Sequence, residues 1–209
     1  MFYPAAQPLI YKSKGDGIMP CLILCAKGDA WKASIRSSLP SDFPSAHILE
    51  FDCDDHGNLS VYGQVPQHDG DVWLFAHGSK RYDDASTVRN KAFVIFGTFD
   101  SKTKIGNVIN NTQLATYLNH AGARRLFLFA CYQGALLQDY ILKIPSLNHC
   151  EGFLGPMNRS GAGQYMKTYF QTPEKAKHLD VAADAGAVRE ACAGSIASYA
   201  AAVASMARM

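Results

Sequence analysis

A histidine and a cysteine each stand directly after a short hydrophobic run of this sequence. Residues 71–76 lead into His77, and residues 126–130 lead into Cys131. Short runs of large apolar residues between polar residues are typical of buried parallel strands. Such strands bind ligands at their carboxyl ends, and a histidine beside a thiol can produce a nucleophilic thiolate. If the two strands are neighbours, about 4.8 Å apart, His77 and Cys131 predict a nucleophilic site at one edge of a sheet.

Strands and helices are expected to alternate along the rest of the chain. Hydrophobic runs predict further strands at 21–26, 47–53 and 150–154. Apolar residues at helical spacing predict helices at 30–39, 112–119, 135–144 and 164–170. Turn residues predict hairpins over 47–62 and 92–108, and the polar segment 79–90 is expected to be a surface loop beside the site. The alternation predicts an α/β fold, a three-layer sandwich in which helices flank a mostly parallel central sheet.

The length and charge of the chain limit its architecture and its partners. A chain of 209 residues favours one domain. We expect an N-terminal arm at residues 1–19 and a single domain over residues 20–209. The end of that domain, residues 174–209, is rich in alanine and is expected to be helical, with a stripe of larger side chains that begins at Val181. A net charge of +2 gives no reason to expect nucleic acid or a membrane as a partner.

The sequence has no obvious membrane span or secretory leader. It contains no stretch of about 18 apolar residues, and its first residues lack the basic start and apolar core of a Sec-type signal. We therefore expect a cytoplasmic protein, or one exported without such a signal, for example an effector. None of the six cysteines forms a Cys-x-x-Cys pair. Five of them are expected to be buried free thiols, and no metal or cofactor is expected.

The order of these motifs is similar to that of the caspase-like cysteine peptidases, a group that includes caspases, metacaspases, legumain and gingipains. The similarity rests on two motifs, Phe75-Ala76-His77-Gly78-Ser79 and Phe129-Ala130-Cys131-Tyr132-Gln133-Gly134. His77 precedes Cys131 by 54 residues (131 − 77), and in caspases the histidine lies roughly 50 residues upstream of the cysteine. The resemblance implies a caspase-like fold from residue 21 to about residue 160.

The resemblance also implies a role for each residue of the two motifs. Cys131 would attack the scissile carbonyl of a protein or peptide substrate and form a thioester acyl-enzyme. His77 would activate the thiol or protonate the leaving amine. The backbone N–H groups of Gly78 and Cys131 would form the oxyanion hole, and the lack of a side chain at Gly78 would let the substrate backbone come close.

Three residues are predicted to contact the substrate, namely Phe129, Asp29 and Ser79. Phe129 stands where caspases have glutamine and metacaspases have an acid, so we expect an uncharged or apolar side chain before the cleaved bond. An acid from elsewhere, such as Asp29, Asp52 or Asp54, could bind a basic side chain instead. Ser79 opens the polar segment beside the site, a position that often carries specificity.

Two other functions remain open from the sequence. A strand followed by His-Gly-Ser also occurs in sirohydrochlorin-type chelatases, where the histidine binds a metal, so His77 could belong to a metal-binding α/β protein. The chain could also be a caspase-like binding module without catalysis. Asp29 closes the first strand at the same predicted edge, and it either belongs to an ordinary loop or orients His77.

Overall fold

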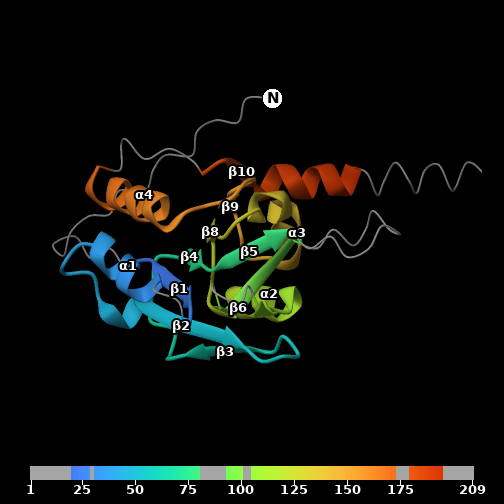
Figure 1. The fold of residues 1–209 in the computed structure, drawn as a ribbon. Helices are drawn as coiled ribbons and strands as arrows, with labels where there is room; N and C mark the ends of the chain where they lie inside the picture. The colour runs from blue at the N-terminus through green and yellow to red at the C-terminus, as the bar shows by residue number, and fades with distance from the viewer. Residues whose placement is uncertain (1–19, 29–30, 81–92, 101–104, 173–178, 195–209) are drawn as a thin grey trace, which may run out of the picture.

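A central sheet with helices on both sides forms the framework of the molecule (Figure 1). The computed structural model describes residues 20–28, 31–80, 93–100, 105–172 and 179–194. The central sheet has seven strands in the order β10-β9-β8-β4-β1-β2-β3, and a separate sheet of three strands has the order β5-β6-β7. The predicted arm at 1–19 and the C-terminal residues from 195 onward lie outside the described residues.

The elements of the structure have the following bounds. The central sheet consists of β1 (Leu22–Ala26), β2 (Ile48–Cys53), β3 (Leu59–Tyr62), β4 (Asp71–Phe75), β8 (Arg125–Phe129), β9 (His149–Gly152) and β10 (Val181–Asp184). The smaller sheet consists of β5 (His77–Lys80), β6 (Phe93–Asp100) and β7 (Ile105–Val108). The helices are α1 (Trp31–Ser38), α2 (Asn111–His120), α3 (Leu137–Lys143) and α4 (Arg159–Gln171), with 3-10 turns η1 (Ser45–His47) and η3 (Gln133–Leu136).

The central sheet is mostly parallel, as predicted. Parallel pairing joins β1 to β2 and β4, β4 to β8, and β8 to β9, whereas the two edge strands β3 and β10 run antiparallel to their neighbours. Phe75 of β4 lies opposite Phe129 of β8. The strands that lead to His77 and Cys131 are therefore direct neighbours, which confirms the arrangement on which the predicted site depends.

Aromatic rings fill the space between the sheet and helices α1 and α4. Phe129 stacks on Phe75 and Trp73, with ring centroids 4.5 Å and 5.3 Å apart. Trp73 also meets the Tyr169 ring of α4 at 4.7 Å, and Phe75 meets the Trp31 ring of α1 at 5.7 Å. Because alternate residues of a strand point to opposite faces, these rings belong to one face, and α2 and α3 lie on the other (Figure 1).

The chain leaves the central sheet immediately before His77. The Ala76 N–H still donates to the Phe129 carbonyl, at 3.2 Å. From His77 onward the backbone forms β5, which pairs antiparallel with β6, so that Ser79 lies opposite Val94. The prediction of a surface loop from residue 79 is therefore wrong for Ser79 and Lys80, because β6 offers them a strand partner. Residues 81–90 of that predicted loop lie outside the described residues.

Most other predicted elements are confirmed, with shifts at their ends. Both hairpins form, β2–β3 and β6–β7, and Asn110 caps α2 by accepting from the N–H groups of Thr112 and Gln113. Val181 is a correction, because it lies in β10 and not on a helix. The helix that follows covers residues 185–194 of the described chain, and the Asp184 side chain accepts from the Ala187 N–H at its start.

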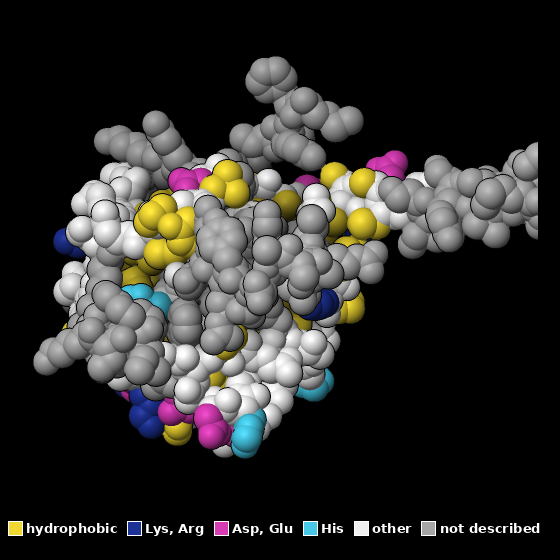
Figure 2. All heavy atoms as spheres, turned by 45° about the vertical axis from the view of Figure 1, so that its right-hand side comes forward, with side chains coloured by type: hydrophobic (Ala, Val, Ile, Leu, Met, Phe, Trp, Pro, Cys, Tyr) yellow, Lys and Arg dark blue, Asp and Glu magenta, His cyan; other side chains and the backbone are white. Residues whose placement is uncertain are grey.

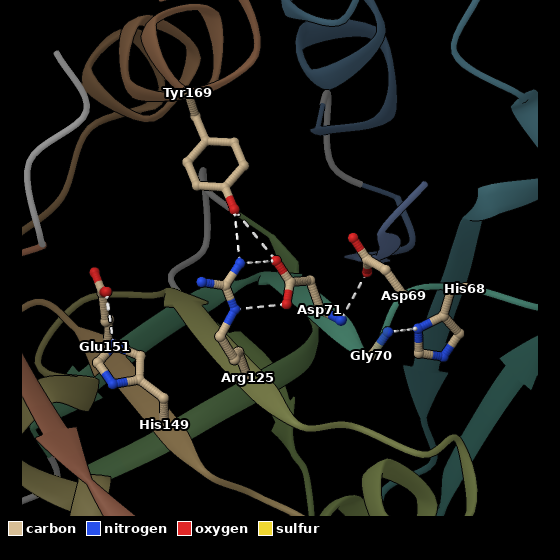
Figure 3. A network of polar contacts seen from close by, with 8 residues as sticks. All are labelled: His68, Asp69, Gly70, Asp71, Arg125, His149, Glu151 and Tyr169. Carbon is tan, nitrogen blue, oxygen red and sulfur yellow. Dashed lines mark hydrogen bonds and ion pairs between the residues drawn. The ribbon is translucent and has the colours of Figure 1, made fainter. Parts of the chain in front are cut away.

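A buried polar network pins the amino ends of β4 and β8 to α4 (Figure 3). Arg125 donates to Asp71 through Nε at 2.7 Å and makes a second contact with the same carboxylate through a terminal nitrogen. The Tyr169 hydroxyl donates to Asp71 at 3.2 Å and accepts from Arg125 at 2.9 Å. Since the Asp71 carboxylate is buried, these bonds replace the water that it loses on folding.

None of the helices in the described part of the chain has the length and hydropathy that crossing a bilayer requires.

Candidate active site

Gly78 packs directly against the backbone of Cys131. A Cβ atom built on Gly78 would lie 2.2 Å from the Cys131 carbonyl oxygen and 2.9 Å from its nitrogen. Both distances are shorter than any van der Waals contact, so only glycine fits this position. The sequence suggested that Gly78 makes room for a substrate. In the structure the backbone of Cys131 occupies this space. The contact brings the two predicted motifs together.

His77 and Cys131 both lie at the carboxyl edge of the sheet. His77 is the first residue of β5, immediately after the buried Ala76, and its imidazole is half-buried. The ring lies 6.2 Å from the indole of Trp31, the first residue of α1, at an interplanar angle of 58°. Cys131 is also half-exposed, two residues beyond the end of β8. Both residues therefore lie just beyond buried strands and are themselves only partly buried.

The thiol of Cys131 lies against the segment that leads into α4. The Met157 N–H donates to Cys131 Sγ at 3.1 Å, and the Met157 carbonyl oxygen lies 3.6 Å from the same sulfur. Met157 directly precedes Asn158, whose side chain caps α4 by accepting from the Gly161 N–H. Sequence reasoning missed this residue. The sequence signal that could have indicated it is Gly155-Pro156, which predicts a turn after the strand that became β9. Because β9 pairs with β8, this turn lies beside the turn that carries Cys131.

A strained turn follows the cysteine. Tyr132 has φ 64° and ψ 5°, the left-handed conformation, and among the described residues it alone does so without being glycine. This conformation costs a non-glycine residue about 1–2 kcal/mol. Two backbone bonds hold the turn, from Tyr132 N–H to Gly155 O at 3.1 Å and from Gly134 N–H to Phe153 O at 2.8 Å. Strain of this kind gathers at functional sites.

The structure does not support Phe129 as a substrate contact. Its side chain is completely buried, inside the stack of Phe75 and Trp73 described above. The residue belongs to β8 and alternates inward, so the ring faces the helix layer and not the sheet edge. Ser79 lies in β5, two residues beyond His77, and Asp29 lies outside the described residues.

The two other acids considered for a basic substrate are engaged in local contacts at the end of β2. Asp52 accepts from the Tyr62 hydroxyl at 2.7 Å and pairs with Lys27 at 3.6 Å. Asp54 accepts from the Asn58 side chain and backbone, and these bonds hold the pKa of Asp54 below its ordinary value. Asp54 thus serves the turn between β2 and β3, and Asp52 holds the hairpin.

Four of the other five cysteines are more buried than Cys131. All six lie in the described part of the chain, and no disulfide joins any of them. Cys21, Cys25, Cys53 and Cys150 are buried as predicted, whereas Cys192 is half-exposed, against the prediction. Burial raises the pKa of Cys25 to about 12 and also raises the pKa of Cys150. These two thiols are therefore poor nucleophiles at neutral pH.

Within the described ranges, no group of three His, Cys, Asp or Glu side chains could hold a metal ion.

Comparison of the chain with protein-family models, curated proteins and solved structures finds no match.

Proposed function

We propose that this protein is a caspase-like cysteine endopeptidase with a His77/Cys131 dyad. The observation that carries the proposal is the packing of Gly78 on the Cys131 backbone, which ties the histidine motif to the cysteine motif at one sheet edge. The half-exposed thiol and the strained turn after it add support. A nucleophile needs this combination of access and fixed position.

The order of the elements supports a caspase-like sandwich as the finer description of the fold. The strand before the histidine and the strand before the cysteine are neighbours in the sheet, and the β6–β7 hairpin and α2 lie between them in the chain. That is the order on which the resemblance to the caspase-like peptidases was based. The observed order of elements agrees with that resemblance, and this agreement supports the proposal.

The proposed reaction uses the chemistry of an acyl-enzyme. The Cys131 thiolate attacks the scissile carbonyl carbon, and the protonated His77 imidazole gives its proton to the leaving amine as the C–N bond breaks. Water then attacks the thioester and gives a proton to His77. The carboxylic acid product leaves, and the thiolate is restored.

The backbone N–H groups of Gly78 and Cys131 are the proposed oxyanion donors. The close packing of Gly78 on the Cys131 backbone supports this role, because it brings the two residues that carry these donors side by side. Loss of one such donor typically costs about 3 kcal/mol of transition-state stabilisation. The burial of Phe129 removes the argument for an uncharged side chain before the cleaved bond, so the substrate is proposed only as a protein or peptide.

Cleavage of a peptide library, with mapping of the new N-termini, tests the proposal. The wild-type protein should cut at a defined set of residues, and Cys131→Ala and His77→Ala should abolish cutting while keeping the native circular dichroism spectrum. A thiol-reactive peptide probe should label Cys131. Labelling at another cysteine instead would refute the assignment.

The same variants separate the two other functions. An unreactive Cys131 in a folded protein would indicate a binding module. Stoichiometric metal that is lost in His77→Ala but kept in Cys131→Ala would indicate a metal-binding protein of the chelatase type.

A further inference from the structure

The segment between β9 and α4, residues 153–158, is hydrogen-bonded to the turn that carries Cys131. Two of the bonds join backbone to backbone, at Phe153 and Gly155, and the third runs from the Met157 N–H to Cys131 Sγ. We call residues 153–158 the β9–α4 segment. These bonds hold the backbone of the turn after Cys131 and also contact the sulfur of Cys131.

The bond from Met157 acts on the reacting atom itself. An N–H group is a donor only, so its bond to sulfur is stronger when the sulfur is a thiolate than when it is a thiol. The neutral thiol can donate to the Met157 carbonyl, which lies 3.6 Å away. The sulfur therefore has a backbone partner in both protonation states, and the donor favours the charged one.

Helix α4 adds to this effect and holds the donor in place. The helix begins at Arg159, directly after the segment, so the positive end of its dipole is the end that adjoins the segment in contact with Cys131. Asn158 closes its first turn by accepting from the Gly161 N–H. Near the other end of α4, Tyr169 bonds to Asp71 and Arg125 (Figure 3). The helix is thus fixed to the sheet at a point far from the sulfur.

We propose that the main-chain N–H of Met157 stabilises the Cys131 thiolate and orients Sγ, in addition to His77. The consequence for peptide cleavage rests on the proposed function, but the stabilisation of the thiolate does not. The side chain at position 157 does not matter for this role, provided that the residue keeps its main-chain N–H group. Proline is the one natural residue that lacks it.

The test compares Met157→Pro with Met157→Ala as the matched control. Both remove the methionine side chain, but only proline removes the donor. Alkylation of the folded proteins by iodoacetamide is followed from pH 5 to pH 10, with the labelled cysteines identified by mass spectrometry. Cys192, which is half-exposed and lies in another helix, serves as the reference thiol in the same chain.

We expect the midpoint of Cys131 alkylation to move to higher pH in Met157→Pro, with about a tenfold slower rate at any pH below both midpoints for a shift of one pH unit. Met157→Ala should match the wild type, and the rate at Cys192 should not change in either variant. Equal midpoints for the proline and alanine variants would overturn the proposal.

A second variant keeps the test decisive if Met157→Pro does not fold. Incorporation of the α-hydroxy analogue of methionine at position 157 replaces the amide by an ester, so it removes the same N–H group and keeps the methionine side chain. It should move the Cys131 midpoint in the same direction as proline, and a midpoint equal to that of the wild type in this variant would then overturn the proposal. Because iodoacetamide needs no peptide recognition, a failure of peptide cleavage would reject the proposed function and leave this inference intact.

Discussion

At the scale of single residues, the surroundings of Cys131 depend on the packing of Gly78 and Phe129. Gly78 lacks a side chain, and the Cys131 backbone occupies the space where one would be. Phe129 lacks exposure, because its ring is stacked inside the core. Both residues were predicted to face the substrate, and both take part in the packing beside Cys131; for Gly78 the proposed role of its N–H group as an oxyanion donor stands beside that packing.

Gly78→Ala is expected to damage the site through a steric clash. The new Cβ would meet the Cys131 backbone at 2.2 Å, so one strand end must move. Overpacking of this kind costs about 1–3 kcal/mol of unfolding free energy. We also expect at least a tenfold loss of Cys131 alkylation rate or of peptide cleavage. Urea unfolding and alkylation kinetics measure the two effects.

Gly155→Ala is the matched control at the same sheet edge. A Cβ at Gly155 meets no atom within 4 Å, so both measurements should stay close to those of the wild type. If Gly78→Ala were as harmless as Gly155→Ala, the close contact between the two motifs would be disproved.

The sequence predicted those features of this site that depend on neighbouring residues in the chain, and not the contacts between distant ones. Two hydrophobic runs ending in His77 and Cys131 were enough to place both residues at one sheet edge. The contact of Met157 with the thiol could not be predicted, because it joins residues 26 apart through a backbone N–H that leaves no trace in residue type. The left-handed Tyr132 was hidden for a related reason, since tyrosine gives no sign of positive φ.

At the scale of elements, hydrophobic periodicity predicted which segments are strands and helices. It did not predict where a strand leaves one sheet and joins another. The run 71–76 reads as one strand, but its partner changes after Ala76, from β8 to β6. A strand can be read from its own residues, whereas its partner depends on long-range pairing. The same limit explains Val181, which has helical spacing yet pairs with Gly152 of β9.

Phe129→Ala is expected to destabilise the protein and not to alter its specificity. The ring is completely buried and lies 4.5 Å from Phe75, so its loss should cost about 3–5 kcal/mol of unfolding free energy. Leu142→Ala is the control, because this side chain is 49% exposed and should cost less than about 0.5 kcal/mol. Full stability together with a changed cleavage preference would show that Phe129 contacts the substrate after all.

Arg125→Met tests the network that fixes α4 to the sheet. The change leaves the buried Asp71 carboxylate without its cation, which should cost about 3–5 kcal/mol of unfolding free energy. Tyr169→Phe removes only a hydroxyl from the same network and should cost about 0.5–1.5 kcal/mol. Thermal or urea unfolding measures both. Equal losses in the two variants would mean that the ion pair contributes no more than the tyrosine.

At the scale of the whole molecule, the carboxyl ends and the amino ends of the parallel strands have different roles. The carboxyl edge carries the candidate site, and the amino edge carries the buried network of Figure 3. The face shown in Figure 2 has scattered acidic and basic side chains and hydrophobic side chains that gather in its upper half. The described side chains of this face therefore do not gather into a patch of one sign that would steer a charged partner.

The amino edge should make stability depend on pH through Asp69. Burial, followed by the nearby Asp71 charge, raises the pKa of Asp69 to about 6 from the ordinary 3.8. A raised pKa means that the folded state favours the protonated carboxyl. The stability that Asp69 contributes is therefore present below about pH 4 and is lost as the pH rises through about 6.

Asp69→Asn should remove this dependence, since asparagine can still accept from the Asp71 N–H, which donates to Asp69 at 2.9 Å. We expect the variant to exceed the wild type by about 1–3 kcal/mol of unfolding free energy above pH 7, and to show no gain near pH 4. Urea unfolding from pH 4 to pH 8 gives the difference. Asp55→Asn, at an exposed position of the β2–β3 turn, is the control and should show no such trend. A gain that is constant with pH would mean that the charge of Asp69 is not the cause.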